Sequence, residues 1–68
     1  MKNYYIRYDI GDGIPSYDFC LRAKDLDKAV KLAQAILEND YPEEWRENRD
    51  FSCRETSAEQ LLKDLTIN

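Results

Sequence analysis

Apolar and polar residues alternate along two stretches near the start of the chain, and an alternation with a period of two predicts a half-buried β-strand. The residues between these stretches, 11–15, include two glycines and a proline, which favour turns. The pattern therefore predicts a β-hairpin with a loop of about five residues. One face of this hairpin carries the apolar side chains Tyr4, Ile6, Tyr8 and Ile10 of the first strand and Tyr17, Phe19, Leu21 and Ala23 of the second.

The next stretch changes period, because its apolar residues recur at spacings of three and four, as on one face of an α-helix. Asp25 is placed to cap the first turn, and Asp27 lies near the positive end of the helix dipole. Pro42 disfavours helical backbone at Tyr41 and therefore predicts the end of the helix. The predicted apolar stripe consists of Leu26, Ala29, Val30, Ala33, Ile36 and Leu37, opposite Lys28, Lys31, Gln34 and Glu38.

Three shorter elements complete the predicted fold. Residues 42–49 are expected to form one helical turn opened by Pro42, and Phe51 and Cys53 alternate with polar residues in a third strand of about five residues. Residues 56–60 match a capping box ahead of a short C-terminal helix that ends near Leu65. We therefore predict a single α+β domain over residues 1–68, in the order β-β-α-β-α. It has a three-stranded antiparallel sheet, one long helix packed on one face and a short C-terminal helix.

The side-chain inventory argues against an enzyme. The chain has 68 residues, two cysteines and no histidine. A domain of this size buries only about 60% of the surface that its unfolded chain exposes, so a deep active-site cavity would take up much of its core. Neither Cys20 nor Cys53 has a histidine base, and no regular metal-ligand spacing is present. We therefore expect no catalytic residue, no bound metal and no cofactor, and two free thiols on opposite faces of the sheet.

The chain shows no pattern for export or membrane insertion. Its first ten residues lack the apolar segment of a signal peptide, and no stretch approaches the roughly 18 apolar residues of a membrane span. We therefore expect a cytoplasmic protein that has no membrane partner.

The net charge of −4 is concentrated in one segment. Residues 38–50 contain six acidic and two basic side chains, whereas the rest of the chain contains eight of each. One interpretation is a solvated surface that keeps the domain soluble. The other is an anionic patch that docks on a basic protein surface, most naturally one that grips phosphates with rows of Lys and Arg. In the second interpretation the partner-binding residues are Glu38, Asp40, Tyr41, Glu43, Glu44, Trp45, Glu47 and Asp50.

Two further features leave alternatives open. Trp45 is expected either to fold back over the open end of the small core or to be a partly exposed aromatic anchor within the acidic segment. The sheet face that the predicted long helix does not cover is either plain solvated sheet or a second contact surface. Its basic residues are few, so we do not expect direct binding of nucleic acid. This face carries Tyr5, Arg7, Asp18, Cys20 and Arg22.

In size and charge the chain resembles small acidic phage-encoded inhibitors of the anti-CRISPR type, through the carboxylates from Glu38 to Asp50 around Trp45. This resemblance implies a non-catalytic inhibitor whose acidic patch blocks a basic, nucleic-acid-binding surface of its target. Residues 4–33 also resemble HicB-like antitoxin domains, in which a hairpin is followed by a helix that opens much like residues 25–29. That second resemblance implies a regulatory subunit that forms a homodimer, whereas the inhibitor is expected to act as a monomer.

Overall fold

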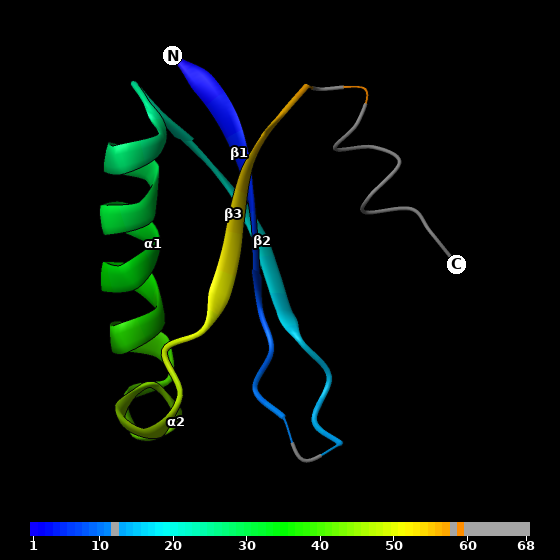
Figure 1. The fold of residues 1–68 in the computed structure, drawn as a ribbon, viewed down its shortest axis with the longest axis vertical. Helices are drawn as coiled ribbons and strands as arrows, with labels where there is room; N and C mark the ends of the chain where they lie inside the picture. Colours follow the sequence, from blue (N-terminus) through cyan, green and yellow to red (C-terminus); the bar gives the residue numbers. More distant parts are fainter. Residues whose placement is uncertain (12, 58, 60–68) are drawn as a thin grey trace.

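Three antiparallel strands form one sheet in the order β2-β1-β3, and a long helix packs against one face of it (Figure 1). The computed structural model describes residues 1–11, 13–57 and 59. The central strand is β1 (Lys2–Tyr8), with β2 (Tyr17–Ala23) on one side and β3 (Phe51–Thr56) on the other. Helices α1 (Leu26–Asp40) and α2 (Pro42–Glu47) connect β2 to β3. The predicted α+β class, antiparallel sheet and packed long helix are confirmed.

The hairpin of β1 and β2 is also confirmed, but its loop is longer than predicted. Strand pairing ends at Tyr8 and Tyr17, so the loop spans residues 9–16. Within this loop the N–H of Ile14 donates to the carbonyl of Gly11 at 2.9 Å. Gly11 and Gly13 have φ angles of 92° and 76°, which favour glycine. The tight turn at the loop's tip therefore lies beyond the regular strands, and Ile10 belongs to the loop.

Helix α1 begins and ends where the sequence predicts. The carboxylate of Asp25 accepts a hydrogen bond from the backbone N–H of Lys28 at 2.9 Å and caps the first turn. Ala29, Ala33 and Leu37 are fully buried against the sheet. Leu26, the first residue of the predicted apolar stripe, is 50% exposed. Leu26 is the first residue of the helix and precedes the first buried residue, Ala29, by about one turn. A position on the apolar side of the helix is therefore not enough to bury it.

The core consists of two clusters that lie along α1. In the first, Tyr4 and Ile6 of β1 pack against three alanines of β2 and α1, whose small side chains allow a close helix–sheet approach: Ala23, Ala29 and Ala33. In the second, Tyr8, Leu37 and Trp45 fill the space between the sheet, the end of α1 and α2. Because Trp45 of this cluster belongs to segment 38–50, the cluster fixes the acidic segment to the core.

The short helical turn predicted after Pro42 is present as α2, which ends at Glu47. Cys20 and Cys53 are free thiols, Cys20 exposed and Cys53 packed against the first cluster on the α1 side, as predicted. Over the described residues the element order is β-β-α-α-β. The predicted C-terminal helix, ending near Leu65, lies outside the residues that the structure describes.

Candidate functional site

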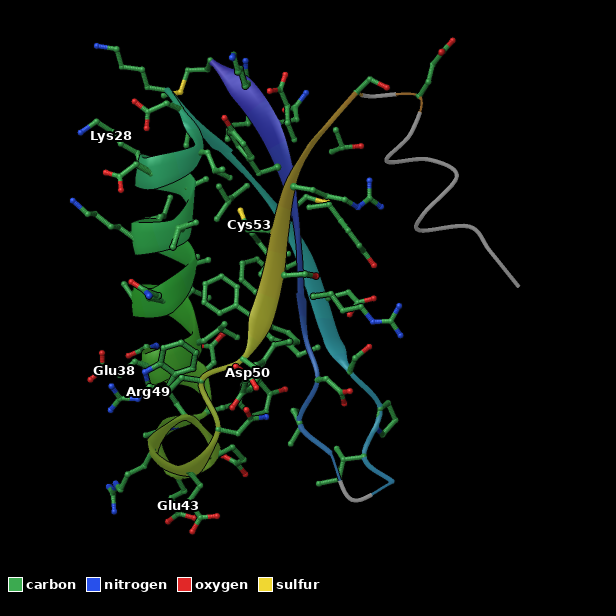
Figure 2. All side chains as sticks on the ribbon, viewed as in Figure 1. Lys28, Glu38, Glu43, Arg49, Asp50 and Cys53 are labelled. Atoms are coloured by element: carbon green, nitrogen blue, oxygen red, sulfur yellow. The ribbon has the colours of Figure 1, made fainter. Side chains whose placement is uncertain are left out.

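Three consecutive elements bring the six acidic residues of segment 38–50 to one end of the molecule, which we name the acidic end. They come from the last turn of α1, from α2 and from the residues just before β3. All six are exposed, and Figure 2 shows the labelled Glu38, Glu43 and Asp50 spread around this end. These three acids therefore lie on different sides of this end and do not share a single flat face. The acidic end consists of Glu38, Asp40, Glu43, Glu44, Glu47 and Asp50.

The carboxylates of the acidic end are not neutralised by ion pairs within the described part of the chain. The ion pairs found there join other residues: Lys2 to Glu55 at 3.7 Å, Arg7 to Asp18 at 3.9 Å and Lys31 to Asp27 at 3.3 Å. One of the segment's two arginines, Arg49, turns toward Trp45. Its Nε donates to the Trp45 carbonyl at 3.3 Å, and its guanidinium carbon lies 5.8 Å from the centre of the indole ring.

Trp45 faces inward, which favours the first of its two interpretations. Its side chain is only 6% exposed. Its ring centre lies 5.9 Å from that of Tyr8 and 5.9 Å from that of Phe51. The indole thus completes a small core that has few other large side chains. The more accessible aromatic residue of the acidic segment is Tyr41, which is half-buried, with its ring 5.0 Å from that of Tyr17.

Hydrogen bonds fix the acidic end to the sheet. The buried hydroxyl of Tyr8 donates to the carbonyl of Asn48 at 2.6 Å, and the Asn48 side-chain amide donates to the carbonyl of Asp9 at 2.9 Å. The hydroxyl of Tyr17 donates to a carboxylate oxygen of Asp40 at 3.1 Å. The two bonds of Asn48 link the connection between α2 and β3 to the end of β1, and the Tyr17 bond links the start of β2 to the end of α1. The acidic side chains therefore extend from backbone segments that hydrogen bonds hold against the sheet.

Burial raises the pKa of Tyr8 above its ordinary value of 10.0, and the nearby carboxylate of Glu44 acts in the same direction. Because the unfolded chain releases this proton at a lower pH than the folded chain, we expect the unfolding free energy to be constant through neutral pH. It should fall as the pH rises above about 10. Urea denaturation between pH 8 and 11, with the ultraviolet absorbance of tyrosinate as a second signal, measures this effect.

Tyr4 and Tyr17 contribute to this fall, since burial also raises the pKa of each phenol. The control is Tyr8→Phe, whose unfolding free energy should fall less steeply over the same pH range. A wild-type unfolding free energy that stays level or rises above pH 10 would contradict the role assigned to the buried phenols.

The opposite face of the sheet brings together the residues predicted to share it, but Tyr5 does not provide an open aromatic surface. Tyr5 is only 7% exposed, and its hydroxyl donates to Asp18 at 2.6 Å. Arg54 is paired with Tyr5 in the register of β1 and β3, and its guanidinium carbon lies 4.9 Å from the ring centre. Arg54 thus occupies the ring face on which a base would stack. Sequence reasoning missed it because the strand register was not yet known.

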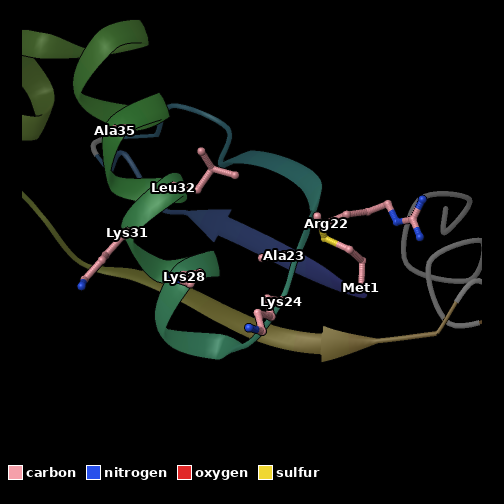
Figure 3. Close-up of a pocket in the computed structure, with 8 residues that line it drawn as sticks. All are labelled: Met1, Arg22, Ala23, Lys24, Lys28, Lys31, Leu32 and Ala35. Atoms are coloured by element: carbon pink, nitrogen blue, oxygen red, sulfur yellow. The ribbon is translucent and has the colours of Figure 1, made fainter.

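Sequence reasoning also missed a shallow groove of about 500 Å³ between α1 and the end of β2 (Figure 3). Four basic side chains line it, one from β2, one from the connection between β2 and α1 and two from α1, and we name it the basic groove. Their spacing in the sequence gives no motif, because neighbouring acids such as Asp25 and Asp27 balance them along the chain. The four are Arg22, Lys24, Lys28 and Lys31.

Within residues 1–11, 13–57 and 59, no group of three or more Cys, Asp or Glu side chains is arranged to hold a metal ion. No helix in that same part of the chain has the length and apolar character needed to cross a membrane. Comparison with protein-family models, with curated proteins and with solved structures found no match.

Proposed function

We propose that this protein is a non-catalytic binding module whose acidic end docks on a basic protein surface. The observation that carries the proposal is the set of six exposed carboxylates at one end of the molecule, none of which forms an ion pair within the described residues. Exposed carboxylates that have no cation at ion-pair distance keep their negative field in the solvent. That field accelerates encounter with a positively charged surface and orients the two proteins as they approach.

The target surface that fits this charge best is one that normally binds phosphates. Such surfaces carry rows of Lys and Arg, and clustered carboxylates can take the place of the phosphate oxygens. The specific form of the proposal is a cytoplasmic phage or mobile-element inhibitor of the anti-CRISPR type, which blocks the nucleic-acid-binding surface of its target. Half-buried Tyr41 supplies aromatic contact area beside the carboxylates.

The hydrogen bonds that hold the acidic end in place reduce the conformational entropy lost on docking. Tyr8, Tyr17 and Asn48 hold the acidic end through hydrogen bonds, and Trp45 anchors α2 in the core. A surface that is already ordered loses little conformational freedom on binding, so more of its interaction energy contributes to affinity. Trp45 thus contributes by holding α2 in place.

Reversal of three acids of the acidic end, Glu43→Lys, Glu44→Lys and Glu47→Lys together, is expected to abolish capture of the target. Wild type and variant are immobilised, exposed to host lysate at moderate salt and analysed by mass spectrometry. A nucleic-acid-binding protein should be retained by wild type only, and its purified form should bind the variant at least about tenfold more weakly. Affinity for wild type should also fall steeply as salt increases.

The matched control carries the same change in net charge at exposed acids outside the acidic end: Asp27→Lys, Glu55→Lys and Glu59→Lys. This control also breaks the exposed ion pairs of Asp27 with Lys31 and of Glu55 with Lys2, which contribute little to stability. It should retain the target, since it leaves the acidic end unchanged. Capture of the same proteins by all three forms would refute the proposed docking surface. Light scattering that shows a salt-insensitive homodimer would instead support the HicB-like alternative, a regulatory homodimeric subunit.

A further inference from the structure

The basic groove carries more positive charge than the described part of the chain neutralises. Lys31 is paired with Asp27 at 3.3 Å across one helical turn. Within the described ranges, Arg22, Lys24 and Lys28 have no carboxylate at ion-pair distance. The groove therefore lies in a positive field and favours an anionic occupant.

The same groove also exposes apolar side chains. Leu32 of α1 is 45% exposed and Met1 is 83% exposed, and both line it together with Ala23 and Ala35 (Figure 3). Large apolar side chains exposed beside unpaired cations suit an occupant that offers both apolar and acidic groups. Because no aromatic side chain of the described residues lines the groove, the bases of a single-stranded nucleic acid would find no stacking partner there.

The groove runs beside an edge of the sheet. Strand β2 pairs with β1 on one side and is the last strand of the described sheet on the other. The backbone N–H and C=O groups on that outer edge can receive an extended peptide as an additional strand. Side chains of an extended peptide alternate in direction, so every second residue would face the helix side, where Leu32 and Ala35 lie. The residues between them would face the other side of the sheet, which carries Arg22.

From these observations we propose that the basic groove binds an extended peptide segment of a partner protein in which acidic residues alternate with aliphatic ones. The aliphatic side chains face α1 and cover Leu32 and Ala35, and the carboxylates face the other side of the sheet, where they pair with Arg22. Lys24 and Lys28 add to the positive field of the groove. This second surface is distinct from the acidic end, so the chain can hold two partners or two parts of one partner. The acidic end of a second copy fits less well, because its large apolar residue, Trp45, is buried.

The test uses a fluorescein-labelled peptide of alternating leucine and glutamate, whose binding is followed by fluorescence anisotropy. Arg22→Glu should weaken binding at least about tenfold, and Leu32→Ser should weaken it severalfold. Arg22→Glu is not expected to harm folding, because Arg22 is exposed on the edge strand and forms no ion pair within the described residues. The matched control is Arg46→Glu, an equal charge change at an exposed residue of α2, which should leave the affinity unchanged.

Two peptide controls separate charge from apolar contact. A serine–glutamate peptide should bind more weakly than the leucine–glutamate peptide, and a leucine–lysine peptide should not bind. Absence of binding by the wild-type protein would overturn the proposal, as would equal losses in Arg22→Glu and Arg46→Glu. The proposal would also be overturned if a single-stranded oligonucleotide displaced the labelled peptide at a lower concentration than the unlabelled peptide does. Displacement of the peptide by self-association of the protein would overturn it as well.

Discussion

Trp45→Ala is expected to lower the unfolding free energy by about 3–5 kcal/mol, the usual cost of removing a large aromatic side chain from a core. A domain of 68 residues has an unfolding free energy of only about 3–10 kcal/mol at typical values per residue. The variant should therefore lose a large part or all of its stability. This is the largest effect that we expect from a single truncation, because the indole is the largest buried side chain of the second core cluster.

The contacts of Trp45 explain the size of this effect. Its ring packs against Tyr8 and Phe51, with ring centres 5.9 Å away in each case, and Leu37 completes the cluster. Truncation would leave a cavity between the sheet and both helices. Because α2 has only six residues, it cannot persist without the packing that holds it against that core.

Urea denaturation followed by far-ultraviolet circular dichroism measures the loss, since the alanine variant has no tryptophan fluorescence. Trp45→Phe is the control: it keeps an aromatic ring in the cluster and should cost clearly less. An alanine variant within about 1 kcal/mol of wild type would show that the indole is not a core residue. That result would restore the interpretation of Trp45 as a surface anchor.

The regular elements of this fold are predictable because each has its own period in the sequence. Alternation identified β1 and β2, and spacings of three and four identified α1 together with its Asp25 cap. Pro42 marked both the end of α1 and the start of α2. Each of these signals lies within a few neighbouring residues, so one sequence is enough to read it.

The features that the sequence did not reveal all depend on contacts between distant elements. The placement of Arg54 over Tyr5 follows from the register of β3 on β1, which no local pattern fixes. The basic groove joins cations of β2 and α1 that are separated by acids along the chain. The acids of segment 38–50 were predictable as a set, but that some of them lie on different sides of the acidic end follows from how α2 packs.

The second large effect is expected from Ala33→Asp. Ala33 is fully buried in the first core cluster, where α1 meets Tyr4 and Ile6 of β1. A carboxylate there would lose its hydration and meet apolar side chains and a tyrosine ring. The effective cost of burying an unpaired charge is several kcal/mol, which is comparable to the whole stability of a domain this small. We therefore expect this variant to be unfolded at neutral pH.

The matched control is Ala35→Asp, the same substitution two residues further along the same helix at an exposed position. Asp in place of Ala lowers helix propensity by a similar amount at both positions, less than about 1 kcal/mol. Any larger difference between the unfolding free energies of the two variants therefore measures the effect of burial. Circular dichroism at neutral pH should show an unfolded Ala33→Asp variant and a folded control. Since a buried carboxyl is less costly when protonated, mild acid should partly restore the fold of Ala33→Asp. Two variants of equal stability would contradict the packing of α1 on β1, and with it the support on which the acidic end is built.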